Sequence, residues 1–67
     1  MSGSLTAIDS TRPLDPAEAM EDLERVRALL EDIYRRALRA EDWELASDVA
    51  VALSRNARAL DVLRMMP

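Results

Sequence analysis

Apolar residues recur in alternating steps of four and three along the first half of the chain, which is the repeat of a helix that packs against another helix. The positions are Ala19, Leu23, Val26, Leu30, Ile33, Ala37 and Ala40. Before them stand Asp15, Pro16 and Glu18, which suit a helix cap, the first helical position and the first turn. The sequence therefore predicts a helix over residues 15–40.

The repeat changes phase after Ala40, and this change predicts a turn. If the same steps continued, they would place Glu44 and Ser47 on the apolar face. Glu41 and Asp42 are each able to cap a new helix, and acidic side chains suit its first turn because of the helix dipole. One continuous helix stays open as the alternative, since neither Gly nor Pro stands at this point.

A second helix is predicted over residues 43–64, and it is apolar on two sides. Its main seam comprises Ala46, Val49, Leu53, Asn56, Leu60 and Leu63. A second apolar stripe comprises Val51, Ala52, Ala59, Val62 and Met66. A helix that is apolar on two sides needs two neighbours. We therefore expect an all-α fold, a two-helix antiparallel hairpin that self-associates into a helical bundle or ring.

The seams of the two helices give the predicted interface of the hairpin or of its oligomer. It comprises Leu23, Val26, Leu30, Ile33, Ala37, Ala46, Val49, Leu53, Asn56, Leu60 and Leu63. Asn56 has two interpretations: a buried amide that fixes register and oligomeric state at some cost in stability, or an edge position that solvent reaches. Trp43, at the predicted turn, is either an anchor for a protein partner or a lid on the end of the core.

The composition removes most catalytic and metal-binding chemistry. The 67 residues include no cysteine and no histidine. The chain therefore has no disulfide framework, no Cys/His zinc site and no cysteine or histidine nucleophile. It also has no Gly-rich phosphate loop. We expect no enzymatic activity, no catalytic residue, no cofactor, no metal site and no small-molecule substrate.

Arginine supplies all of the positive charge, and its densest group is Arg35, Arg36 and Arg39. Together with Trp43, this group is a candidate contact for a partner, because guanidinium groups bind phosphates and carboxylates. Alternatively, it is a solvated helix end with ion pairs such as Asp32–Arg36. The net charge of −4 disfavours nonspecific DNA binding, which depends on neutralising phosphates. We expect DNA binding to be weak at most.

Residues 1–14 predict a flexible N-terminal arm, because Ser, Thr, Gly and Pro interrupt any apolar repeat there. The chain has no apolar run of the length that spans a bilayer. Its N-terminal residues lack the basic and apolar regions of a secretory signal. We therefore expect no membrane partner and a cytoplasmic location.

Residues 35–42 read Arg-Arg-Ala-Leu-Arg-Ala-Glu-Asp, and Trp43 and a run rich in Ala and Leu follow. This pattern, within Leu29 to Leu63, resembles the helical-hairpin oligomerisation segment of small terminase subunits. Those subunits are DNA-packaging proteins of tailed bacteriophages and gene transfer agents. The resemblance covers about half of the chain. It implies a non-catalytic oligomeric adaptor that recruits a large terminase ATPase–nuclease.

Many small terminase subunits carry an N-terminal helix-turn-helix domain, and none precedes the hairpin in this sequence. The resemblance therefore implies self-assembly and recruitment rather than direct recognition of a DNA sequence. The alternative from another class is a small regulatory adaptor, an inhibitor or antitoxin-like chain that binds one protein by placing a helix in a groove. Weak nucleic-acid binding is a third option.

Overall fold

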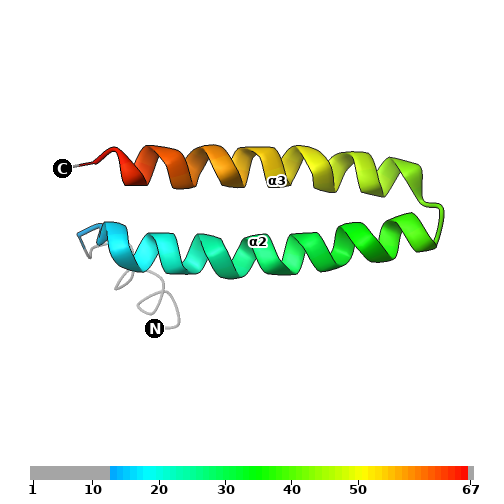
Figure 1. Ribbon diagram of the computed structural model, residues 1–67, viewed down its shortest axis with the longest axis horizontal. Helices are drawn as coiled ribbons and strands as arrows, with labels where there is room; N and C mark the ends of the chain where they lie inside the picture. Colours follow the sequence, from blue (N-terminus) through cyan, green and yellow to red (C-terminus); the bar gives the residue numbers. More distant parts are fainter. Residues whose placement is uncertain (1–12, 67) are drawn as a thin grey trace, which may run out of the picture.

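The structure is a computed structural model that describes residues 13–66, and within that range it contains two helices and no strand. Helix α2 is Pro16–Arg39 and helix α3 is Trp43–Arg64. The helices lie side by side in opposite directions, with the turn at one end (Figure 1). The predicted all-α antiparallel hairpin is confirmed, and the alternative of one continuous helix is wrong. Residues 1–12 of the predicted arm lie outside the described residues.

The start of α2 follows from its first residues. Asp15 is the N-cap, and its Oδ1 accepts a hydrogen bond from the backbone N–H of Ala17 at 3.1 Å. Pro16 follows at the first helical position, where its fixed φ suits a helix and its missing N–H would have no helical partner. The helix begins one residue later and ends one residue earlier than the predicted range, whereas α3 has the predicted bounds.

The turn is short because one residue, Asp42, both closes the end of α2 and caps the start of α3. The N–H of Asp42 donates to the carbonyl of Ala37 at 2.9 Å, and the N–H of Glu41 donates to that of Leu38 at 3.0 Å. This is the Schellman pattern of a helix end. Glu41 has the left-handed backbone that the pattern requires, with φ of 56°. Asp42 also caps α3, since its Oδ1 accepts from the N–H of Leu45 at 3.1 Å.

The core between the helices is narrow and consists largely of small residues. Its buried residues are Ala37, Ala46, Val49, Asn56 and Leu60. The partly buried members of the predicted interface are Leu23, Leu30, Ile33, Leu53 and Leu63. Val26, from the same predicted set, is 42% exposed. No large side chain of the described residues is fully buried. The hairpin alone therefore covers only part of its apolar surface.

Candidate interaction surfaces

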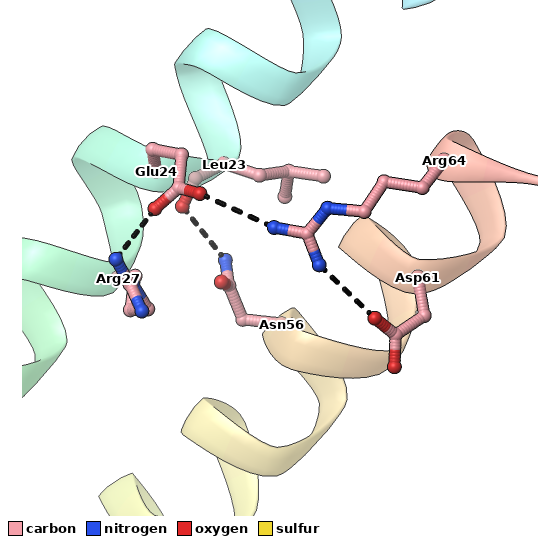
Figure 2. A network of polar contacts seen from close by, with 6 residues as sticks. All are labelled: Leu23, Glu24, Arg27, Asn56, Asp61 and Arg64. Atoms are coloured by element: carbon pink, nitrogen blue, oxygen red, sulfur yellow. Dashed lines mark hydrogen bonds and ion pairs between the residues drawn. The ribbon is translucent and has the colours of Figure 1, made fainter.

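Asn56 is the only polar residue buried in the described part of the chain, with 7% of its surface exposed. Its Nδ2 donates a hydrogen bond to the backbone carbonyl of Leu23 on α2, at 3.2 Å (Figure 2). Its Oδ1 is buried without a hydrogen-bond partner. Solvent does not reach this amide, so the interpretation that placed Asn56 at a solvated edge is wrong for the hairpin.

The geometry of Asn56 favours a role in register. Its hydrogen bond connects one point on α3 to one point on α2. If α3 slid along α2, the whole amide would be buried without a partner, and an unpaired buried polar group costs about 1–3 kcal/mol. The bond therefore penalises other alignments of the helices, while the unpaired Oδ1 lowers the stability of this one.

One side of the hairpin, the charged side, has an ion-pair network centred on Arg64. Its guanidinium lies 3.7 Å from the carboxylate of Glu24 on α2 and 3.1 Å from that of Asp61 on α3 (Figure 2). Glu24 also lies 2.7 Å from Arg27. These side chains are substantially exposed, so each pair stabilises the hairpin by about 1 kcal/mol at most. An open hollow of about 490 Å³ on this side is lined by Ala17, Met20, Glu21, Glu24, Arg25, Leu60 and Arg64.

The opposite side of the hairpin is largely apolar, and its charged residues on α2 are Asp22 and Arg36. Glu24 and Ile33 are nine residues apart on α2, which is two and a half helical turns, so they point in opposite directions. Ile33, Ala40 and Leu45 line a hollow of about 220 Å³ near the turn. Further apolar residues continue from this hollow at helical spacing. This apolar side comprises Val26, Leu29, Ile33 and Ala40 before the turn, and Leu45, Ala52, Ala59 and Met66 after it.

The large side chains of the apolar side are exposed in the hairpin. Leu29 is 65% exposed, and Leu45 and Met66 are each 42% exposed. Contiguous exposed apolar surface is typical of interaction sites. Leu29 and Leu45 were absent from the interface predicted from the sequence. The seven-residue spacing of Leu45, Ala52 and Ala59 is the signal that would have found Leu45.

The second predicted stripe is divided between two surfaces. Ala59 and Met66 belong to the apolar side, whereas Val51 and Val62 are each more than half exposed. Val51 lies nine residues before the buried Leu60, so it points away from α2. Val51 and Val62 therefore lie on the outer surface of α3, three helical turns apart, with Arg55 and Arg58 between them.

The candidate partner contact lies at the turn end of the hairpin. Trp43 is 62% exposed, so the interpretation in which it closes the end of the core is wrong. Arg35 and Arg36 both approach Asp32, at 3.9 and 2.8 Å, in exposed ion pairs. Arg39 makes no ion pair with any residue that the structure describes. Helix α2 ends and α3 begins at this same end, so the four candidate residues share it (Figure 1).

The described residues offer neither a metal site nor a membrane-spanning helix beside these surfaces. In the described region, no group of three or more acidic side chains is placed to hold a metal ion. Neither helix there has both the length and the apolar character needed to cross a bilayer. No protein-family model, curated protein or solved structure matches the chain. The surfaces described above therefore carry the functional argument.

Proposed function

We propose that this chain is a non-catalytic adaptor that acts as an oligomer, as small terminase subunits do in viral-type DNA packaging. The observation that carries the proposal is the apolar side, because the hairpin leaves Leu29 and Leu45 exposed. A helical surface of this kind is stabilised by packing against another helical surface. Symmetric homo-oligomers are the usual result for a single small chain.

The narrow core supports self-association independently of the exposed residues. Most of its buried apolar residues are small, and Leu60 is the largest of them. Chains of this length rarely gain more than about 3–5 kcal/mol from one core. Burial of further apolar surface against a second hairpin would add to that stability.

The packaging role rests on the resemblance of Leu29 to Leu63 to the oligomerisation segment of small terminase subunits. In the hairpin this segment covers the second half of α2, the turn and nearly all of α3. The partner is then a large terminase ATPase–nuclease. Trp43 and the nearby arginines suit its contact, because Trp and Arg are enriched at the centres of protein interfaces. Since Arg35 and Arg36 pair with Asp32, direct DNA binding is proposed to be weak at most.

Binding to the large terminase from the same genome tests this role. We expect the purified chain to bind it on a biosensor surface, and Trp43→Ala to weaken the binding about 10-fold or more, as at an interface hot spot. Met65→Ala is the matched control, because Met65 is exposed at the other end of α3. An oligomeric chain with no affinity for the large terminase would contradict the packaging role.

The second candidate function is an adaptor that binds one protein through a single helix. The exposed Val51 and Val62 favour it, because both side chains lie on the outer surface of α3, with Arg55 and Arg58 between them. Such a helix surface fits a groove on a partner that has apolar pockets for the valines and acidic groups for the arginines. A chain that stays monomeric alone and forms a one-to-one complex with another protein would favour this function over the first.

A further inference from the structure

We infer that two hairpins pair through their apolar sides about a two-fold axis that runs across the helices. Helix α2 then lies antiparallel to α2 of the second copy, and α3 to α3, in a four-helix bundle. This inference rests on the self-association in the proposed function, and it adds the surface, the axis and the contacts. Two observations carry it: the positions of the apolar residues and the positions of the charges beside them.

The heights of the apolar residues along the hairpin locate the axis. Leu29 lies twelve residues before Glu41 and Ala52 lies eleven residues after it, so the two are at nearly the same height. An axis at that height places Leu29 against Leu29 of the second copy, and Ala52 against Ala52. The most exposed large side chain of the apolar side is then buried at the centre of the interface.

Four of the six remaining apolar residues pair with one another about this axis. Val26 lies three residues before Leu29 and Ile33 lies four residues after it, so each meets the other across the interface. Leu45 and Ala59 lie seven residues to either side of Ala52. On α3 the large Leu45 of one copy therefore meets the small Ala59 of the other, and on α2 two β-branched side chains of similar size meet.

The charges beside the apolar side are complementary about the same axis. Asp48 lies four residues before Ala52 and Arg55 three residues after it, so Asp48 of each copy faces Arg55 of the other. Neither makes an ion pair or side-chain hydrogen bond with any other described residue. The dimer supplies each of them with a partner of opposite sign, twice by symmetry.

Helix α2 repeats this complementarity. Asp22 and Arg36 lie seven residues to either side of Leu29, so the axis brings the carboxylate of one copy toward the guanidinium of the other. Both side chains are exposed, and among the described residues they pair only within α2, with Arg25 and Asp32. Complementary charges in an interface set its orientation more than its affinity. The charges therefore select the antiparallel pairing.

Disulfide trapping tests the axis, because a residue on a two-fold axis is its own partner. The chain has no cysteine, so a single introduced cysteine reports one position. We expect Ala52→Cys and Leu29→Cys each to form a disulfide-linked dimer in a glutathione buffer. The matched control is Ser54→Cys, an exposed position on α3 outside the apolar side. Its disulfide-linked dimer should form at least about 10-fold more slowly than that of Ala52→Cys. A disulfide requires the Cα atoms of the two cysteines to lie within roughly 7 Å of each other.

Several outcomes would overturn the inference. If Ser54→Cys cross-links as fast as Ala52→Cys, the paired surface is wrong. If a mixture of Leu29→Cys and Ala52→Cys forms mainly mixed disulfides, α2 packs on α3 of the second copy and the axis is wrong. In both cases self-association, and with it the proposed function, survives. If no variant cross-links and the unmodified chain has the mass of one chain at every concentration, self-association fails too.

Charge reversal gives a second test that needs no cross-link. Asp48→Arg and Arg55→Asp each place like charges opposite one another at two symmetric points. Each should raise the dissociation constant of the dimer roughly 10-fold at low salt, and the double variant should restore it. The inferred contacts would be contradicted if the single variants had unchanged dissociation constants. They would also be contradicted if the double variant had a higher dissociation constant than either single variant.

Discussion

Asn56 is the residue at which stability and specificity oppose each other. One half of its amide binds the carbonyl of Leu23, and the other half is buried without a partner. An apolar residue of similar size would place no unpaired polar atom at this site. A single polar residue in a helical seam instead favours one register over others. The hydrogen bond to Leu23 is the physical basis of that role here.

Substitution of Asn56 separates these two effects. We expect Asn56→Leu to raise the free energy of unfolding by about 1 kcal/mol, because the unpaired buried oxygen is removed. The distribution of assembly masses should broaden, since the register is no longer fixed. Denaturant unfolding and light scattering at one fixed concentration measure the two results. Ser54→Leu, at an exposed position, is the control, and a less stable but homogeneous Asn56→Leu would contradict this interpretation.

Glu41 is the second residue whose local conformation lowers the stability of the hairpin. It has a left-handed backbone, which costs a residue with a Cβ about 1–2 kcal/mol. We expect Glu41→Gly to raise the free energy of unfolding by about 0.5–1 kcal/mol, the gain being reduced by the greater freedom of Gly in the unfolded chain. Glu44→Gly, in the first turn of α3, should instead lower it by up to about 1 kcal/mol. If both substitutions lowered the free energy of unfolding equally, the left-handed backbone of Glu41 would not be a cost that Gly relieves.

At the scale of elements, α2 and α3 are joined by a turn in which Asp42 serves both. Its N–H closes the end of α2 and its side chain caps α3. We expect Asp42→Ala to lower the free energy of unfolding by about 1 kcal/mol through loss of the cap. Asp42→Asn should keep most of the stability, because asparagine caps a helix equally well. Thermal unfolding followed by circular dichroism compares the two, and equal losses would show that the cap contributes little.

The helices were predictable because each has a strong local signal. The four–three repeat and the Asp15–Pro16 start define α2, and the change of apolar phase defines the turn. The absence of Gly left one continuous helix open as the alternative, because a left-handed Glu41 leaves no mark in the sequence. The chain turns there since the Schellman hydrogen bonds and the Asp42 cap together offset the cost of that backbone.

The candidate surfaces were predictable only in part. Exposure depends on how α3 rotates about its axis against α2, and the periodicity alone does not specify that rotation. For this reason the sequence leaves two interpretations for both Trp43 and Asn56, and only the structure shows that Trp43 is exposed and Asn56 buried. Leu45 was missed, and Leu29 was read only as widening the apolar stripe of the first helix, because the main seams already accounted for one apolar face on each helix. Their importance follows only when the two helices are placed side by side.

As a complete unit, the hairpin has two of the helices that a four-helix bundle needs to cover its apolar surfaces. Its two helices bury small residues between them and leave a second apolar surface exposed along their length. The paired arrangement covers that surface and supplies partners for Asp48 and Arg55. This pairing does not use Val51 and Val62 on the outer surface of α3, nor Arg35, Arg39 and Trp43 at the turn end. They are therefore available to a further partner or to larger assemblies.

The measurement that tests self-association most directly is the absolute mass in solution, by light scattering after size exclusion over a wide range of concentration. We expect an assembly of two chains of 7.5 kDa each, or of any multiple of two chains. Leu29→Glu should shift the mass toward one chain while circular dichroism still reports a helical hairpin. A well-folded chain that keeps the mass of a single copy at the highest concentration would contradict the account.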